Sequence, residues 1–330
     1  MTSQDELPLV SVVMPIRNEE HFIERCLGAV LQQDYPADKI EVLIADGMSD
    51  DRTVEIIESL TGADRVRIVP NPERIQSYGL NHIIPLAKGD YIVRIDGHTI
   101  IEADYIRQCV KTLQETGADN VGGGMDAVGI TAIGKAIATA GNSAFAVPAA
   151  FHVSATAQYT DTVYLGAWSA RVFERIGLFN TELVTNEDYE LNYRIRKSSG
   201  KIYYNPAIKS IYYSRQTWSQ LARQYYRYGR GKVKMLRQYP ESLRPRQTVA
   251  PLFVVGLLSG LVLALISRPL RWIYVGVLFL YLLLGLIFAI RAVSKQSEDV
   301  SIWRTLLTFI IMHIAWGLGF WREVIKPGAF

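Results

Sequence analysis

The sequence predicts an α/β domain with a parallel sheet and covering helices, followed by a hydrophobic C-terminal region. Residues 9–120 alternate short β-branched runs with segments of helical periodicity, and this alternation is typical of parallel sheets covered by helices. Beyond residue 248, apolar stretches reach the length of roughly 20 residues that a membrane-spanning helix needs.

The first four strands are expected in short apolar runs. These runs are LVSVVMP (9–15), where the proline is expected to stop the strand, IEVLIADG (40–47), VRIV (66–69) and YIVRID (91–96). Helices are expected over 17–33, from about Asp51 to Leu60, and from about Glu73. Parallel sheets bind ligands beyond the carboxyl ends of their strands, so Asp46 and Asp96 are expected at one shared edge.

Composition and motifs exclude several classes of protein. The chain has 35 basic and 32 acidic residues and a net charge of +3, which is too balanced for a nucleic-acid-binding protein. The turn PIRNEE after the first strand lacks the G-x-G-x-x-G of dinucleotide oxidoreductases. No cleavable signal peptide is expected at the polar N-terminus, and Cys26 and Cys109 are expected as reduced core thiols.

Asp96, Gly97 and His98 form a candidate metal site at the end of the fourth strand. A carboxylate-rich edge without a phosphate cradle indicates that a metal ion neutralises a diphosphate there. Gly97 allows a tight turn that directs both flanking side chains to one point. Taken alone, these residues are explained better by an ordinary strand exit.

Several stretches together resemble the inverting family-2 glycosyltransferases with the GT-A fold. They are VSVVMPIRNEE, ADGMSDDRT, NPERIQSYGLN, KGDYIVRIDGH and NEDYELNYRIRKSSGKIYYNP, which follow in order over roughly residues 9–240. The chain resembles in particular the ExoA-like subgroup of bacterial exopolysaccharide synthesis, where the metal motif also reads Asp-Gly-His. The expected organisation is a GT-A domain with a mixed sheet over 1–214, an amphipathic interfacial region over 215–248 and a transmembrane region over 249–330.

The resemblance implies roles for the residues that match the family's motifs. Contacts to the nucleotide sugar are implied for Pro15, Arg17, Asn18, Glu19, Asp46, Arg74, Asp96, Gly97, Gln224 and Arg227. Asp46 would hold the nucleobase, and Arg74 would lie beside the uracil and diphosphate. Gln224 and Arg227 match a Gln-x-x-Arg-Trp motif of membrane-bound polysaccharide synthases, with Tyr228 in place of the tryptophan.

Asp96 and His98 stand where the family has Asp-x-Asp, and the resemblance implies that they bind a divalent metal. An imidazole in place of the second carboxylate removes a negative charge and adds a softer ligand. We therefore expect Mn²⁺ to be favoured over Mg²⁺.

Asp188 matches the family's general base, and Glu187 lies beside it. In an inverting transfer, a carboxylate takes the proton of the acceptor hydroxyl while the metal stabilises the departing nucleotide diphosphate. Capping of the helix N-terminus is the competing explanation for this acidic pair. Trp168 is expected either near the sugar or acceptor, stacked on a ring, or in the core.

The C-terminal region contains two apolar segments over 249–266 and 272–290, and a third over 302–321 that either spans the membrane or lies shallow in it. Just before them, residues 215–237 carry seven arginines and lysines, no acidic residue, and interleaved aromatic side chains. This composition predicts an interfacial helix on anionic membrane lipids.

The resemblance implies transfer of a sugar, glucose from UDP-glucose, onto a polyprenyl-diphosphate-linked saccharide at the inner membrane of a bacterium, with the catalytic domain in the cytosol. Two or three membrane segments can hardly enclose a polymer channel, which favours addition of one sugar. One alternative uses polyprenyl phosphate itself as acceptor, as dolichyl-phosphate-sugar synthases do. The other is a non-catalytic scaffold that binds nucleotide sugars and recruits other polysaccharide-synthesis enzymes.

Overall fold

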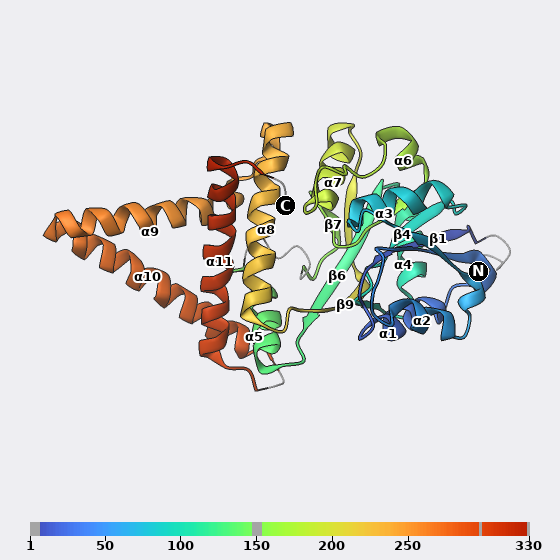
Figure 1. The fold of residues 1–330 in the computed structure, drawn as a ribbon, viewed down its shortest axis with the longest axis horizontal. Coiled ribbons are helices and arrows are strands. Elements are labelled where there is room, and N and C mark those ends of the chain that lie inside the picture. The colour runs from blue at the N-terminus through green and yellow to red at the C-terminus, as the bar shows by residue number, and fades with distance from the viewer. Residues whose placement is uncertain (1–6, 147–153, 297–298, 329–330) are drawn as a thin grey trace. The chain divides into compact units, whose positions relative to one another are not determined.

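The computed structural model describes residues 7–146, 154–296 and 299–328. It divides into two compact units, one formed by residues 1–126 and 151–212 and the other by residues 127–150 and 213–330 (Figure 1). The second boundary, at Tyr213, lies next to the division expected from the sequence. Residues 127–150, expected in the GT-A domain, instead belong to the second unit, because the apolar face of helix α5 (Ala132–Gly141) is buried there.

The first unit is built on a nine-stranded mixed sheet in the order β3-β2-β1-β4-β8-β6-β9-β5, with β7 paired to β9. Its parallel part comprises β1 (Val10–Ile16), β2 (Ile40–Asp46), β3 (Val66–Pro70) and β4 (Tyr91–Arg94). Antiparallel pairs join β4 to β8 (Ala167–Ser169), β8 to β6 (Asn120–Val128), and β9 (Ile202–Tyr213) to both β5 (Thr99–Ile101) and β7 (Gln158–Tyr159). The parallel arrangement predicted from the first four strands therefore holds for one half of the sheet.

Helices cover both faces of this sheet because its strands are apolar on both sides. One core contains residues of α1 (Ile23–Leu31), α2 (Thr53–Ser59) and α4 (Tyr105–Thr116), and the other contains residues of α3 (Gln76–Ile83), α6 (Arg171–Ile176) and α7 (Glu187–Lys197) (Figure 1). Successive residues of β1 alternate between them, so that Val12 packs in the first core and Val13 in the second. Cys26 and Cys109 are free and buried in the first unit, as the sequence predicts.

Strand β1 continues through Pro15 to Ile16, whereas the proline was expected to stop it. Pro15 is in register with Ala45 of β2, but the pairing of β1 with β4 ends at Val13. A proline is tolerated where one side of a strand has no partner, because no ladder hydrogen bond requires its missing N–H. The extra residues carry the following loop to the carboxyl edge of the sheet.

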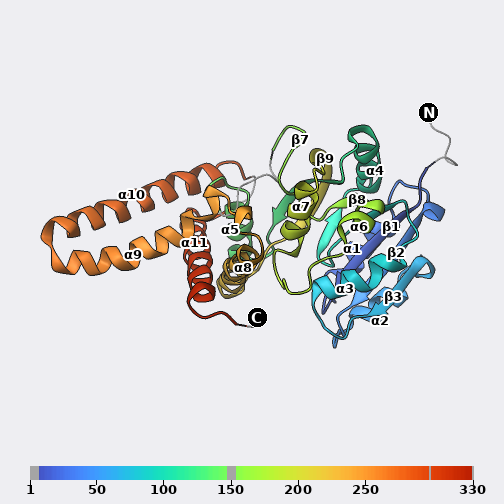
Figure 2. The same ribbon diagram turned by 90° about the horizontal axis from the view of Figure 1, so that it is seen from above.

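The second unit is helical and is shown from two directions in Figures 1 and 2. Helix α8 (Trp218–Gln238) packs along α11 (Ile302–Ile325), while α9 (Val249–Ile266) and α10 (Arg268–Val293) form a hairpin beside them. The first pair meets at glycines, because a Cβ at Gly229 would overlap the backbone oxygen of Trp316 and one at Gly319 would overlap that of Tyr226. Short 3₁₀ helices elsewhere in the chain are Ala37–Lys39, Ala63–Arg65, Ile84–Leu86, Pro240–Ser242 and Pro245–Gln247.

Three helical segments in the described part of the chain are long and apolar enough to cross a membrane: Pro245–Ile266, Arg268–Val293 and Ile302–Ile325. The sequence predicts two or three such segments. The most apolar stretches of the first two are largely exposed, with 22% and 11% of their residues buried, whereas 56% of the third is buried. Much of α11 therefore packs against protein, mainly α8, and α9 and α10 carry most of the exposed apolar surface.

Candidate active site

The turn formed by Asp96, Gly97 and His98 follows β4 at the carboxyl edge of the sheet, as predicted. The amide of Thr99 closes it by donating a hydrogen bond to the backbone oxygen of Asp96, at 3.0 Å. Gly97 does not have the positive φ that would require glycine. Instead, a Cβ at this position would lie 2.9 Å from Cγ of Glu19, so the glycine is needed for a close approach between side chain and backbone.

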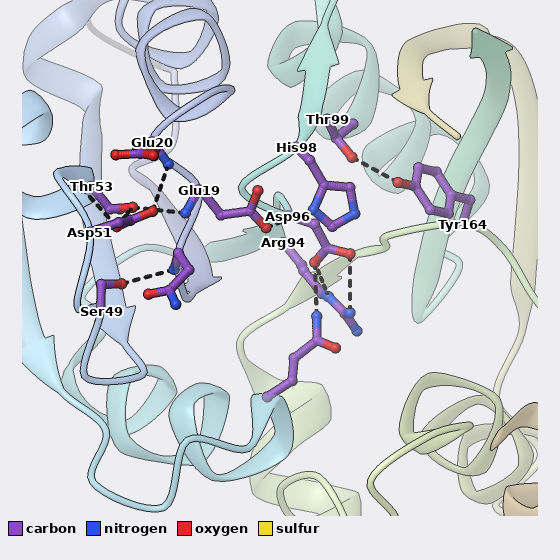
Figure 3. Close-up of polar contacts among 12 residues, drawn as sticks. Glu19, Glu20, Ser49, Asp51, Thr53, Arg94, Asp96, His98, Thr99 and Tyr164 are labelled. Carbon is purple, nitrogen blue, oxygen red and sulfur yellow. Dashed lines mark hydrogen bonds and ion pairs between the residues drawn. The ribbon is translucent and has the colours of Figure 1, made fainter. Parts of the chain in front are cut away.

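Two side chains hold the carboxylate of Asp96 in one orientation (Figure 3). Arg94 donates from Nε to Oδ1 at 2.9 Å, and Gln76, at the start of α3, donates from Nε2 to the same oxygen at 3.1 Å. Arg94 also approaches Oδ2, at the longer distance of 3.4 Å. Because an ionised carboxylate oxygen accepts more than one hydrogen bond, Asp96 retains acceptor capacity for a cation or another ligand.

The imidazole of His98 is oriented by its neighbours. Its Nδ1 lies 2.9 Å from Oε1 of Glu19, and the ring of Tyr212 makes an edge contact with it at a centroid distance of 5.5 Å. No hydrogen bond reaches Nε2 from residues in the described ranges. That nitrogen is therefore the one available to a ligand.

The donor set at this turn fits a divalent cation that is shared with a substrate. Among the described residues, no group of three or more His, Cys, Asp or Glu side chains forms a complete metal cluster. Asp96 and His98 supply one carboxylate and one imidazole, and Mg²⁺-type sites commonly use one or two protein ligands together with substrate phosphates and water. The side chains therefore suit a metal held jointly with a diphosphate.

Arg94 connects this turn to the start of α7, and it was not among the site residues predicted from the sequence. Its side chain is almost fully buried, with 5% of the residue exposed, and Nη1 lies 3.3 Å from Oε1 of Glu187. The same guanidinium pairs with Asp96, so one buried cation lies between two carboxylates from distant parts of the chain. The available signal was a charged residue inside the apolar run YIVRID, because a charge in a buried strand needs a partner.

Glu187 and Asp188 occupy the first turn of α7. Burial raises the pKa of Glu187, the nearby charge of Asp188 adds to this effect, and Arg94 opposes it. Burial also raises the pKa of Asp188, against the opposing effects of Arg94 and of the Tyr189 amide. That amide donates to Asp188 Oδ1 at 2.7 Å, so Asp188 also interacts with the helix N-terminus, as the capping explanation requires. A carboxylate with a raised pKa beside a cation has the properties of a general base.

The loop after β1 is joined to the loop after β2 by hydrogen bonds. The Asn18 amide donates to Ser49 Oγ at 3.0 Å, and the Glu19 amide donates to Thr53 Oγ1 at 2.7 Å (Figure 3). Asp46 accepts from the hydroxyl and the amide of Ser49, at 2.5 and 3.1 Å. The predicted residues Asn18, Glu19 and Asp46 thus come together at one edge of the sheet.

The other residues predicted to contact the nucleotide sugar differ in their surroundings. Pro15 is buried inside β1, whereas Arg17 is exposed and its side-chain carbons lie against Gly47. Arg74 is exposed just before α3 and has a left-handed backbone, with φ of 58°. Its loop leads directly to Gln76, which contacts Asp96.

Gln224 and Arg227 lie on α8 in the second unit. Gln224 donates from Nε2 to the hydroxyl of Tyr228 at 2.9 Å, and Arg227 is exposed. The tyrosine that replaces the tryptophan of the synthase motif therefore contacts the glutamine of the same motif.

Trp168 was expected either near the sugar or in the core, and the structure places it in the core. It is 1% exposed and packs edge-on against Phe173 and Phe179. It occupies β8 between two neighbouring strands, so the ring faces the apolar layer beneath α6.

Two glycosyltransferase family models and several known proteins match this chain. Residues 11–141 match the family model "Glycosyl transferase family 2", and residues 91–290 match "Glycosyl transferase family group 2". The succinoglycan biosynthesis protein ExoA of Rhizobium meliloti is 31% identical over 329 residues, covering 98% of each chain. A Methanococcus voltae protein, a dolichyl N-acetyl-alpha-D-glucosaminyl phosphate 3-beta-D-2,3-diacetamido-2,3-dideoxy-beta-D-glucuronosyltransferase, is 28% identical and covers 96% of this chain and 97% of its own length.

A solved structure shares the fold over nearly the whole chain. The mannosyltransferase PcManGT from Pyrobaculum calidifontis, in complex with GDP-Man and Mn²⁺, has a TM-score of 0.67 at 16% identity, covering 98% of this chain and 89% of the mannosyltransferase. The second family model matches more than half of the residues, and ExoA is similar from end to end. This chain therefore belongs to the family-2 glycosyltransferases and has their GT-A fold.

Proposed function

We propose that this glycosyltransferase adds a single sugar, with inversion at the anomeric carbon, to a lipid-linked saccharide in cell-surface polysaccharide synthesis. One observation carries the proposal. Arg94 contacts both Asp96, which is expected near the donor diphosphate, and Glu187, which lies beside the expected base. The residues expected to serve these two functions therefore belong to one buried cluster of charges. An in-line displacement needs these two functions around the same sugar.

Asp188 is the general base in this proposal. It takes the proton of the acceptor hydroxyl while that oxygen bonds to the anomeric carbon and the bond to the donor diphosphate breaks. Glu187 and Arg94 hold the start of α7 beside Asp96. A divalent cation bound by Asp96 and His98 would offset the negative charge that develops on the departing diphosphate.

The donor is proposed to be UDP-glucose. Asp46, with Asn18 and Arg17, would bind the nucleoside, Arg74 the base and diphosphate, and Gln224 and Arg227 the diphosphate. Mn²⁺ is proposed over Mg²⁺ because His98 replaces a carboxylate, and the Mn²⁺ in the PcManGT complex supports a divalent metal in this fold.

The acceptor is proposed to be a saccharide on a polyprenyl diphosphate. The name of the Methanococcus voltae relative supports this class, because it describes an acceptor in which a sugar is already attached to a lipid phosphate. The apolar helices α9, α10 and α11 and the basic helix α8 support attachment to anionic membrane lipids, proposed here to be those of the bacterial inner membrane with the catalytic unit in the cytosol. Other polysaccharide-synthesis enzymes are proposed partners on the same membrane.

A donor and acceptor panel tests the proposal. The full chain in detergent is incubated with UDP- and GDP-sugars, with Mn²⁺ or Mg²⁺, and with either polyprenyl phosphate or a saccharide linked to polyprenyl diphosphate. We expect release of UDP that depends on the metal, is highest with UDP-glucose and Mn²⁺, and requires the saccharide-lipid. Equal activity with Mg²⁺ would contradict the metal preference, and equal activity with polyprenyl phosphate would contradict the acceptor.

Asp188→Asn tests the assignment of the base. Asparagine keeps the shape of the side chain but cannot take a proton, so transfer should fall by about 10²–10⁴-fold while UDP binding stays near that of the parent. The matched control is Glu174→Gln, which neutralises an exposed carboxylate on α6. Turnover of Asp188→Asn within tenfold of the parent would remove Asp188 from the mechanism.

A further inference from the structure

We propose that Glu19 is a positioning residue that fixes the tautomer and direction of the His98 ring, so that His98 presents Nε2 to a divalent cation. This inference rests on the proposed metal site at Asp96 and His98. It gives Glu19 a role different from the nucleotide contact implied by the family motif.

The contact between the two side chains determines which nitrogen carries the proton. Oε1 of Glu19 lies 2.9 Å from Nδ1 of His98 (Figure 3). An ionised carboxylate can only accept hydrogen bonds, so Nδ1 is the protonated nitrogen that donates. In neutral imidazole the lone pair then lies on Nε2, and carboxylates commonly orient metal-binding histidines in this way.

The backbone around Glu19 directs its side chain to this position. Its amide donates to Thr53 Oγ1 at 2.7 Å, and its carbonyl accepts from the amides of Phe22 and Ile23, each at 2.8 Å. Gly97 leaves the space that the side chain occupies, since a Cβ there would lie 2.9 Å from Glu19 Cγ. The loops after β1, β2 and β4 therefore combine to place one carboxylate against one imidazole.

The pairing also explains why a histidine suits this site. An aspartate at position 98 would face the carboxylate of Glu19 as a like charge, which disfavours the ionised form of both groups. An imidazole instead donates to it. The ring of Tyr212 also packs against that of His98 in an edge arrangement, with 5.5 Å between the ring centroids, which restricts rotation of the imidazole. Glu19 and His98 thus form a matched pair.

Binding of Mn²⁺ alone to the full chain in detergent tests the inference without a turnover assay. Free Mn²⁺ is counted by electron paramagnetic resonance, and ¹⁴N modulation of the bound ion reports a histidine nitrogen. We expect Glu19→Ala to weaken Mn²⁺ binding by about 10–100-fold. Glu19→Gln should stay within about threefold of the parent, because its amide oxygen still accepts from Nδ1. The control is Glu20→Ala, which removes the neighbouring carboxylate.

The outcomes separate failure of this inference from failure of the metal site. If the parent shows ¹⁴N modulation and Glu19→Ala binds Mn²⁺ as tightly, the positioning role of Glu19 is overturned and the metal site stands. If Glu19→Gln is as weak as Glu19→Ala, charge rather than ring orientation is responsible, and the inference is also overturned. Three outcomes would support the inference. His98→Asp should lose the ¹⁴N modulation, and Glu19→Gln/His98→Asp should partly restore Mn²⁺ binding. The single variants should show the same thermal unfolding as the parent.

Discussion

At the level of single residues, the geometry of the site depends on Arg94. A buried guanidinium is unfavourable unless carboxylates compensate its charge, and here Asp96 and Glu187 do so at 2.9 and 3.3 Å. Each carboxylate is in turn held by the arginine. The charges on β4 and on α7 therefore stabilise one another.

Arg94→Met should destabilise the catalytic unit by about 3–5 kcal/mol, because it leaves two buried carboxylates without their counter-charge. The measurement is chemical unfolding of the full chain in detergent. The triple variant Arg94→Met/Asp96→Asn/Glu187→Gln removes all three charges and should recover part of the loss. If the triple variant is no more stable than Arg94→Met, uncompensated charge is not the cause.

The raised pKa values of Glu187 and Asp188 predict how activity depends on pH. The base must be ionised to accept a proton, so kcat/KM should rise with pH as the base loses its proton. Ordinary carboxylates titrate at a pH of about 4, and the raised pKa values place this rise above that pH. Glu187→Gln removes a neighbouring negative charge and should move this rise to lower pH. A rise centred at or below pH of about 4 in the parent would contradict the environment described for this pair.

The same shifts predict the pH dependence of stability. In the native state the two carboxyl groups hold protons at pH values where the unfolded chain has released them. The free energy of unfolding should therefore fall as the pH rises from the unfolded pKa of about 4 through the raised native pKa, as far as these two groups contribute. The Glu187→Gln variant should show a smaller fall.

At the level of secondary-structure elements, helices α8 and α11 are held together by close backbone contact and by charge. Gly229 and Gly319 allow the backbones to touch at two points. Arg230 on α8 pairs with the buried Glu323 on α11, with 2.9 Å between Nε and Oε2. Helix α8, predicted to lie on membrane lipids, therefore packs its apolar face against another helix. Its basic residues Arg223 and Arg227 are exposed.

Gly319→Ala should lower the stability of the second unit by about 1–3 kcal/mol, because a Cβ there overlaps the backbone of Tyr226. Gly276→Ala on α10 is the matched control. A Cβ at that position meets nothing within 4 Å, so the higher helix propensity of alanine should leave stability unchanged or raise it by up to about 1 kcal/mol. Thermal unfolding of both variants in the same detergent checks the prediction, and equal midpoints would contradict the packing.

At the level of the whole molecule, α9 and α10 are long and apolar enough to cross a membrane. Their 18 and 26 residues correspond to about 27 and 39 Å of helix, against a hydrocarbon core of about 30 Å. Their exposed apolar side chains include Leu258 and Leu280, which are 60% and 54% exposed. Such a surface is compatible with lipid and unfavourable in water.

Leu258→Arg/Leu280→Arg should reduce membrane insertion of the hairpin. A charge near the centre of a spanning helix costs about 2.5–3.5 kcal/mol for each residue, whereas in water the same changes cost almost nothing. The measurement is the fraction of chain that stays in the membrane pellet after alkaline carbonate extraction. Leu258→Ala/Leu280→Ala is the control, and equal retention of both variants would mean that these faces do not contact lipid.

Local patterns in the sequence were sufficient for the first half of the first unit, and the resemblance to the family-2 glycosyltransferases indicated the reaction class. Alternation and helical periodicity depend on neighbouring residues, so they located the strands from β1 to β4, the helices between them and the apolar C-terminal segments. The metal turn and the acidic pair at residues 187 and 188 were recognisable because each is contiguous in the chain. The roles proposed for these residues remain predictions.

Contacts between distant segments were decided by tertiary structure alone. Arg94 and Glu187 are 93 residues apart, and Glu19 and His98 are 79 apart, so no local pattern connects them. For the same reason the sequence left Trp168 between two roles and gave no sign that residues 127–150 cluster with the second unit. Burial and charge compensation depend on which segments pack together, and that is settled only when the whole chain folds.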